Sequence, residues 1–195
     1  QHYPMSDITP RHRVNGYPPR SPEYRRLAEG QFKEWRLAIC GLVKHPICLS
    51  LEDLRQLPKQ EQITKHNCIQ GWSGVAEWGG VPMHAVINLC HPLSHVRYVA
   101  FHAFMQEEYA PDSYYEVLTF DEVLDPQTIL AYEMNWKPLP IEHGAPCRLR
   151  IETKTGYKMV KYLTTIEFIE DLSRVGQGYG GYREDHQFYD KVASI

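Results

Sequence analysis

The sequence predicts a mixed, β-rich α+β fold in a single domain. Segments with strand-like alternation outnumber segments with helical signals. Both kinds are short, and they are interleaved without the regular strand–helix–strand repeat of a doubly wound sheet. The chain has 195 residues, of which 43% are hydrophobic. That is enough for one domain with a substantial core, but not for two full domains.

Four short helices are expected, and most of them have a recognisable start signal. Ser21 caps a helix that has Pro22 near its first position. Thr119 and Glu122 form a capping box, and Ser50 begins a similar one with an aspartate in the glutamate position. The expected helices cover residues 22–30, 51–58, 83–89 and 120–125.

Six strand segments are expected from alternating apolar and polar residues. In the first of them, Trp35, Leu37 and Ile39 share one face. Another is interrupted by a turn at Asn135 and Trp136, so it is expected to form a hairpin. The expected segments cover residues 35–43, 62–68, 97–105, 129–140, 148–152 and 161–170.

Both ends of the chain differ in composition from its middle. Residues 1–22 contain five prolines, so they are expected to form an arm and not a regular element. The last 20 residues contain four glycines and are expected to form a loop and tail. The expected organisation is an arm at 1–22, a domain at 23–172 and a glycine-rich tail at 173–195.

Composition excludes several classes of protein. No apolar run approaches the roughly 18 residues of a membrane-spanning helix, and a net charge of −3 argues against nucleic-acid binding driven by bulk positive charge. Five cysteines without a C-x-x-C spacing indicate neither a disulfide framework nor a zinc knuckle. Because the chain starts at Gln1, we expect a processed or truncated product, and the compartment stays open between bacterial cytoplasm and periplasm.

The segment 66–74 is the sharpest local feature, and it reads HNCIQGWSG. A cysteine at a strand end, followed at once by a glycine-rich turn, is poorly explained by core packing, because glycines permit close approach of a bulky group. A thiolate suits a soft or high-valent metal. From the residues alone, Cys68 is either a buried structural thiol or a metal ligand or nucleophile.

A second cluster combines cations with glycines. It consists of the segment 143–148 (HGAPCR) and the segment 156–161 (GYKMVK). Arginine gives a bidentate fork to phosphate and lysine gives a point charge, so these residues could hold an anion. The alternative is a hairpin with solvated cations.

Other candidate sites are weaker. His91 and His95 have the i, i+4 spacing of zinc ligands on a helix, but Pro92 lies between them. The glycines near residues 176–181 lie too close to the C-terminus for a dinucleotide-binding βαβ unit.

These segments together resemble the molybdopterin-binding domain of the sulfite oxidase family, especially its bacterial sulfite-oxidase-like members. The similarity runs from about residue 15 to about residue 168. It rests on four segments that occur in the family's order: 66–74, 130–135 (LAYEMN), 143–148 and 156–163. The resemblance implies the sulfite oxidase fold and a cofactor of molybdenum with one molybdopterin dithiolene.

The resemblance also implies roles for individual residues. Cys68 matches the thiolate that binds molybdenum, and it is the expected catalytic and metal-ligating residue. Arg148 matches a contact to the terminal phosphate, and Asn15 falls where an arm contacts the cofactor, so truncation ahead of Asn15 is expected to be harmless. The full set of expected cofactor-binding residues is Asn15, His66, Cys68, His143, Arg148, Lys158, Met159, Val160 and Lys161.

The chain departs from the family pattern at three places. Residues 69–74 contain none of the arginines that follow the ligating cysteine in eukaryotic sulfite oxidases, so a cationic sulfite pocket is in doubt. Asn135-Trp136 replaces Asn-Gly in the hairpin, so we expect a turn other than type I′, or Trp136 exposed for a partner. Tyr182, Tyr114 and Tyr115 are loose candidates for the pocket.

The leading functional hypothesis is a molybdenum-dependent oxidoreductase that transfers an oxygen atom to or from a small S- or N-oxide or sulfite-like substrate. The resemblance leaves no room for a fused cytochrome, so a separate cytochrome or haem membrane subunit is the expected redox partner of a monomeric chain with no span of its own. The alternatives are a non-catalytic module of the same fold that binds cofactor or protein, and a hydrolase with Cys68 as nucleophile and His66 as base.

Overall fold

The structure, a computed structural model, describes residues 1–106, 109 and 112–186. Its α-helices are α1 (Pro22–Glu29), α2 (Leu51–Gln56), α3 (Met83–Cys90), α4 (Phe120–Val123) and α5 (Tyr182–Asp185). Its strands are β1 (Arg36–Gly41), β2 (Ile47–Ser50), β3 (Gln60–Asn67), β4 (Ser73–Pro82), β5 (Tyr98–Ala103), β6 (Tyr115–Thr119), β7 (Ile129–Met134), β8 (Lys137–Pro138), β9 (Arg148–Arg150) and β10 (Leu163–Ile169). Short 3₁₀ turns include η1 (Met5–Asp7), η3 (Ile141–His143), η4 (Gly156–Lys158) and η5 (Leu172–Arg174).

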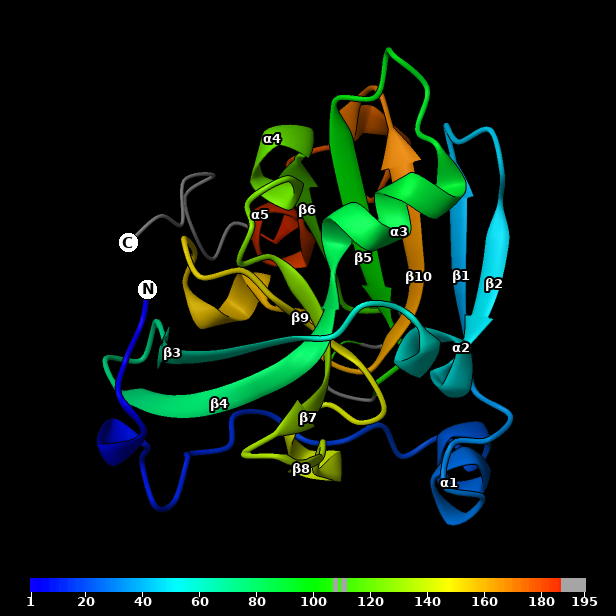
Figure 1. The fold of residues 1–195 in the computed structure, drawn as a ribbon. Coiled ribbons are helices and arrows are strands. Elements are labelled where there is room, and N and C mark those ends of the chain that lie inside the picture. The colour runs from blue at the N-terminus through cyan, green and yellow to red at the C-terminus, as the bar shows by residue number, and fades with distance from the viewer. Residues whose placement is uncertain (107–108, 110–111, 187–195) are drawn as a thin grey trace.

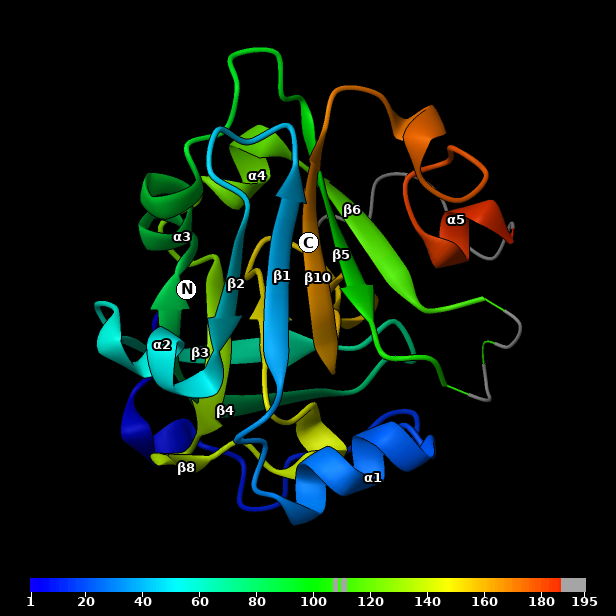
Figure 2. The same cartoon turned by 90° about the vertical axis from the view of Figure 1, so that its right-hand side faces the viewer.

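The strands form two sheets. The first has the order β2-β1-β10-β5-β6, and within it only β1 and β10 are parallel. The second has the order β3-β4-β7-β8, with β9 also paired to β7. Figure 1 shows β3 and β4 running across the molecule while β5 and β10 stand upright. Figure 2 shows the strands of the first sheet side by side, with α5 beyond β6. The expected mixed α+β fold is therefore confirmed.

The main core lies where the two sheets face each other. Its members are fully or almost fully buried, and they come from alternate positions of strands in both sheets, as a half-buried sheet requires. From the first sheet they are Leu37, Ile39, Val99, Phe101, Ile166 and Phe168, and from the second Val81, Leu130, Tyr132 and Leu149. The expected shared face of Trp35, Leu37 and Ile39 is confirmed, since all three are buried.

The helix starts follow the local signals in the sequence. Ser21 Oγ accepts a hydrogen bond from Tyr24 N at the start of α1. Both capping boxes form, Ser50 with Asp53 at α2 and Thr119 with Glu122 at α4, each with reciprocal side-chain and backbone bonds. These short helices need such bonds because their first N–H groups have no partner inside the helix.

The β7–β8 turn contradicts the first of the two expectations from sequence, a turn other than type I′, whereas Trp136 is exposed as the second expectation required. Asn135 and Trp136 both have positive φ, 52° and 57°, which is the type I′ pattern that we expected a tryptophan to avoid. Buried Glu77 explains the exception: its backbone O accepts from Asn135 N at 2.9 Å and its Oε2 from Trp136 N at 2.7 Å, while Asn135 Oδ1 accepts from Glu77 N at 3.0 Å. These bonds offset the steric cost. The Trp136 side chain is 46% exposed.

The N-terminal arm lies along the second sheet instead of extending from the domain. Tyr3 N donates to Ile63 O of β3, and Thr9 N donates to Val75 O of β4. Thr9 Oγ1 in turn accepts from Val75 N at 3.0 Å. Figure 1 shows the arm passing beneath β4 on its way to α1. The part of the expected tail beyond residue 186 lies outside the described residues.

Gly80, at the register shift between β4 and β7, leaves no room for a side chain. A Cβ built on Gly80 would lie 2.1 Å from Leu130 O and 2.6 Å from Ala131 Cα, so the two backbones would have to separate. We predict that Gly80→Ala lowers the free energy of unfolding by about 1–3 kcal/mol. The measurement is chemical denaturation.

Gly30→Ala is the matched control, because its nearest contact would be 3.4 Å at a φ of −78°. Equal stability of the two variants would show that the close approach at Gly80 is not a constraint.

Candidate functional site

A pocket opens at the end of the β3–β4 hairpin. The residues that line it come from the N-terminal arm, the β3–β4 loop, the segments around η3 and η4, the β5–β6 connection and α5. Residues from near both ends of the chain, from His12 to Arg183, therefore meet in one cavity.

Cys68 lies in the wall of this pocket on a tight turn. Cys68 N donates to Trp72 O at 2.9 Å, Gly71 N donates to Cys68 O at 3.0 Å, and Gly71 has the positive φ of 87° that closes the turn. The thiol is 9% exposed, and its Sγ accepts from Asn15 Nδ2 at 3.6 Å. The arm therefore contacts the cysteine, and the contact of Asn15 with the cofactor that the resemblance implied stays a prediction.

The arm places His12 in the centre of an aromatic cluster. The His12 ring lies 5.4 Å from the ring of His143, 5.7 Å from that of His66, 6.0 Å from that of Trp72 and 5.9 Å from that of Trp78. Lys161 Nζ donates to Asn15 O at 2.7 Å and so fixes the arm a few residues further on.

The expectation that truncation ahead of Asn15 is harmless does not fit this geometry. His12 and Arg13 line the pocket, and residues 1–9 hold the arm on β3 and β4. His12 was not a candidate in the sequence, although the cationic run from Arg11 to Arg13, just ahead of Asn15, was a signal.

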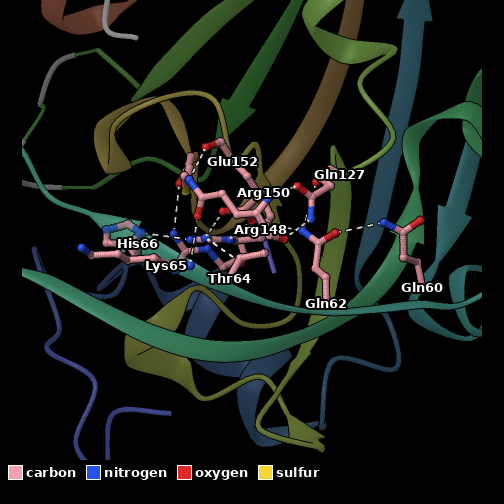
Figure 3. A network of polar contacts seen from close by, with 11 residues as sticks. Gln60, Gln62, Thr64, Lys65, His66, Gln127, Arg148, Arg150 and Glu152 are labelled. Carbon is pink, nitrogen blue, oxygen red and sulfur yellow. Dashed lines mark hydrogen bonds and ion pairs between the residues drawn. The ribbon is translucent and has the colours of Figure 1, made fainter. Parts of the chain in front are cut away.

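Two buried arginines of β9 lie at the site, and Arg148 is the one that lines the pocket. The guanidinium carbons of Arg148 and Arg150 lie 4.9 Å and 4.3 Å from the centre of the Trp78 ring. Arg150 is neutralised by Glu152, to which Nη2 donates at 2.7 Å, and its Nη1 donates to His66 Nδ1 at 2.9 Å. Figure 3 shows this network running from His66 through Arg150 to Glu152.

Arg148, in contrast, has only backbone carbonyls as partners. Its Nη1 donates to His143 O at 2.9 Å and its Nη2 to Met159 O at 3.4 Å. Within the described part of the chain, no carboxylate lies at ion-pair distance from it. Burial and the nearby Arg150 charge lower the pKa of Arg148 to about 9, so the side chain remains a cation at neutral pH and lacks a counter-charge.

The pocket histidines are held neutral. Burial, aided by the charge of Arg148, lowers the pKa of His143 to about 3, and burial with the Arg150 and Arg148 charges lowers the pKa of His12 to about 4. Burial and the same arginines bring the pKa of His66 well below its usual value. These rings therefore act as neutral hydrogen-bonding groups, and the positive charge of the site comes from arginine and lysine.

These features fit an anionic ligand that carries many hydrogen-bond acceptors. Arg13, Arg148, Lys161 and Arg183 line the pocket, and Glu142 is the one carboxylate among the described residues that line it. His12 Nε2, Trp72 Nε1 and Arg148 Nε are buried without a hydrogen-bond partner in the described residues. Buried polar groups without partners are costly, so a ligand that satisfies them is expected.

Space for such a ligand is kept by a glycine next to His66. A Cβ on Gly156 would lie 2.3 Å from His66 Nε2. The pocket offers one thiol for a metal, several cations for a phosphate and several neutral hydrogen-bond donors. These groups fit a phosphorylated pterin that carries a metal bound through sulfur.

The structure brings most of the expected cofactor residues to the pocket. Those that line it are Asn15, His66, Cys68, His143, Arg148, Met159 and Lys161. Val160 does not; its side chain belongs to the main core. The expected roles of these residues stay predictions, to which the structure adds their common location.

Lys158 requires a correction. Its Nζ is buried and donates to Glu116 Oε2 at 2.7 Å, and it also pairs with Glu184 Oε1 at 2.5 Å. The ammonium is therefore turned away from the pocket and neutralised, so it does not provide the cofactor contact that we expected of it. Sequence reasoning missed this because Glu116 lies 42 residues away.

The weaker candidates do not gather into sites. α3 ends at Cys90, and His91 takes the left-handed conformation, so His91 and His95 do not share a helix face. The described residues contain no group of three or more His, Cys, Asp or Glu side chains suited to a metal. Tyr114 lines the pocket, whereas Tyr115 and Tyr182 do not line it. Cys68 Sγ accepts a hydrogen bond from Asn15, and His66 Nδ1 is bonded to Arg150 and not to the thiol, which weighs against the hydrolase alternative.

Comparison with known proteins decides the family. The sequence model of the oxidoreductase molybdopterin-binding domain matches residues 25–175. The chain belongs to this family. The expected family, its fold and its cofactor, molybdenum with molybdopterin, are thereby confirmed.

Individual relatives agree with the family assignment. The chain is 33% identical over 186 residues, 95% of its length, to a putative protein-methionine-sulfoxide reductase subunit of Azospira oryzae. It is 32% identical over 149 residues, 71% of its length, to the protein-methionine-sulfoxide reductase catalytic subunit of Campylobacter jejuni. The chain spans 64% and 50% of these two proteins.

A solved structure shows the same fold. The sulfane dehydrogenase SoxCD of Paracoccus pantotrophus superimposes with a TM-score of 0.64 at 21% identity, over 71% of this chain and 39% of that one. In the part of this chain that the structure covers, no helix combines the length and the apolar character needed to cross a bilayer.

The position of His12 gives a test of the arm. We predict that His12→Ala weakens cofactor binding by about 5- to 150-fold, and so lowers the molybdenum bound per chain under limiting cofactor, because the loss of a buried hydrogen-bond donor and its packing is worth about 1–3 kcal/mol. The measurement is elemental analysis of purified protein.

His2→Ala is the control, since His2 is an exposed residue of the same arm. Equal molybdenum content in the wild type and both variants would show that the arm does not contribute to the cofactor site.

Proposed function

We propose that this chain is the catalytic domain of a molybdenum-dependent oxidoreductase that reduces a small S-oxide, with electrons supplied by a separate haem protein. The two curated relatives described above carry the name of a protein-methionine-sulfoxide reductase. The loop that follows Cys68, residues 69–74, contains no arginine. A neutral sulfoxide is therefore favoured over the sulfite dianion at this wall.

The observation that carries the proposal is the position of Cys68. Its thiol lies in the pocket wall, 3.6 Å from Asn15 Nδ2, and the cations of the floor and rim surround the same cavity. A thiolate ligand at the edge of an anion site suits a metal that changes oxidation state by two electrons.

The reaction balances with water as second product. The sulfur–oxygen bond of R₂S=O breaks, two electrons and two protons enter, and R₂S and H₂O leave. The bound cofactor supplies the two-electron couple, and the haem partner supplies the electrons in single steps.

The chain's own residues bind and orient the reactants. Cys68 would hold the molybdenum through its thiolate, and Arg148 and Lys161 would bind the anionic part of the cofactor. Neutral His12 and His143 can donate or accept single hydrogen bonds without adding charge. The Arg150–Glu152 pair fixes the His66 ring through Nδ1, which leaves its Nε2–H directed away from the network.

Replacement of the proposed metal ligand tests this function. We predict that Cys68→Ser keeps the fold but lowers dye-driven reduction of methionine sulfoxide by at least about 100-fold, as expected when a covalent metal ligand is lost. Turnover with a reduced viologen dye and elemental analysis for molybdenum are measured together.

The control is Cys48→Ser, because Cys48 is exposed and lies away from the pocket. Undiminished turnover in Cys68→Ser would refute the assignment. Molybdenum-loaded wild-type protein that turns over no oxide would favour the non-catalytic alternative. Reduction of an oxidised dye by sulfite, without turnover of any oxide, would show that the enzyme oxidises its substrate instead of reducing it.

A further inference from the structure

The C-terminal segment, residues 176–186, contributes Arg183 to the wall of the pocket although the family model ends at residue 175. Val117 N of β6 donates to Gly180 O at 3.1 Å, and Glu116 and Gly181 form an isolated bridge. The segment therefore extends the edge of the first sheet. Figure 2 shows α5 beyond β6 at this edge.

Buried ionic contacts fix this segment. Lys158 Nζ lies between Glu116 Oε2 and Glu184 Oε1 and also donates to Gly180 O at 3.1 Å. All three charged side chains are 5% exposed or less. Buried ionisable groups are costly unless each is paired and held in place, so the arrangement favours one position for α5.

Asp185 adds a second anchor. Its carboxylate accepts from Gln177 N at 2.8 Å and Tyr179 N at 3.0 Å, and also from the hydroxyl of Tyr115. A Cβ on Gly176 would lie 1.7 Å from Tyr115 Oη, so the turn fits closely against β6. A helix of four residues is thus held by two buried carboxylates of its own.

The one α5 residue that lines the pocket is Arg183, which lies between the anchors Tyr182 and Glu184 in the sequence. Its guanidinium carbon lies 5.8 Å from the centre of the Tyr109 ring. Tyr109 in turn packs against Tyr114 at 4.7 Å and Tyr182 at 4.9 Å between ring centres. A cation is therefore presented to the pocket on a rigid aromatic support.

This wall differs from the part of the pocket assigned to the cofactor. Arg148, Lys161 and Asn15 connect to one another through the η3 segment and the arm. Arg183 comes instead with tyrosines and Gln106 from the β5–β6 side. The loop after Cys68 has no cation of its own, and Arg183 is a cation of the pocket that comes from outside this loop.

We infer that Arg183 is a substrate-binding residue, which donates a hydrogen bond to a sulfur-bound oxygen that carries partial or full negative charge. Tyr109 and Tyr114 provide the apolar surface for the carbon groups on that sulfur. The inference rests on the proposed function for its substrate class. The oxygen can belong to a neutral sulfoxide or to an oxyanion such as sulfite, and the experiment separates the two.

The test measures binding apart from turnover. Molybdenum-loaded wild type, Arg183→Gln, Arg183→Lys, Arg183→Ala and Arg174→Gln are titrated calorimetrically with methionine sulfoxide and, separately, with sulfite. Arg174 is the control because it is an exposed arginine of the same C-terminal stretch that lines no part of this pocket. Molybdenum content is measured on every sample.

We expect Arg183→Gln to weaken binding of the probe that the wild type binds by about 10- to 100-fold, the range of a hydrogen bond to a charged group. Arg183→Lys should be intermediate, because lysine keeps the charge without the planar fork. Added guanidinium should partly restore binding in Arg183→Ala, which a purely structural role would not allow. Arg174→Gln should match the wild type, and molybdenum content should not change.

The outcomes separate this inference from the proposed function. Wild type that binds a probe through Arg183 but reduces no oxide would refute the function and keep the inference. Equal binding in Arg183→Gln and wild type would overturn the inference, as would failure of the wild type to bind either probe. Loss of molybdenum from Arg183→Gln would make Arg183 a cofactor residue and overturn it as well.

Discussion

Two arginines lie against the same indole ring, and within the described part of the chain only one of them has a carboxylate partner. Arg150 is paired with Glu152, whereas buried Arg148, beside it on Trp78, is bonded only to backbone carbonyls. A buried cation without a counter-ion is unfavourable, and the fold retains it at the floor of a cavity. Much of the architecture around this cavity can be understood as support for a site that an anion completes.

The support comes from the whole chain. β9 carries both arginines, β4 carries Trp78, and the tight β3–β4 loop places Cys68 at the rim. Both ends of the chain then close the cavity, the arm through His12 and Asn15 and the C-terminal segment through α5. The domain core alone would leave two sides of the pocket open, so the site depends on the ends as much as on the sheets.

Local signals in the sequence predicted the elements that depend on local bonds. The capping boxes at Ser50 and Thr119 and the Ser21 cap formed as expected, because each needs only residues three positions apart. β4 was missed, because its glycines and final proline hide a strand whose shape is set by close packing on β7. The turn at Trp136 was also misjudged, since the buried carboxylate that stabilises it belongs to Glu77 on another strand.

The same distinction holds for the site. The resemblance pointed to Cys68, His143 and Arg148, which all line the pocket. These residues could be found because each lies in a contiguous segment that can be recognised in the sequence. His12 and Arg183 were not found, since only the tertiary fold brings the ends of the chain to the cavity. Lys158 was misassigned because the carboxylates that neutralise it come from β6 and α5.

The central claim is that Cys68 joins the molybdenum of a single molybdopterin in this pocket. X-ray absorption at the molybdenum edge, which counts the sulfur atoms bound to the metal, tests it most directly. The account predicts three sulfur ligands in the wild type, two from one dithiolene and one from Cys68, and two in Cys68→Ser. An unchanged sulfur count in the variant, with the metal still bound, would contradict it.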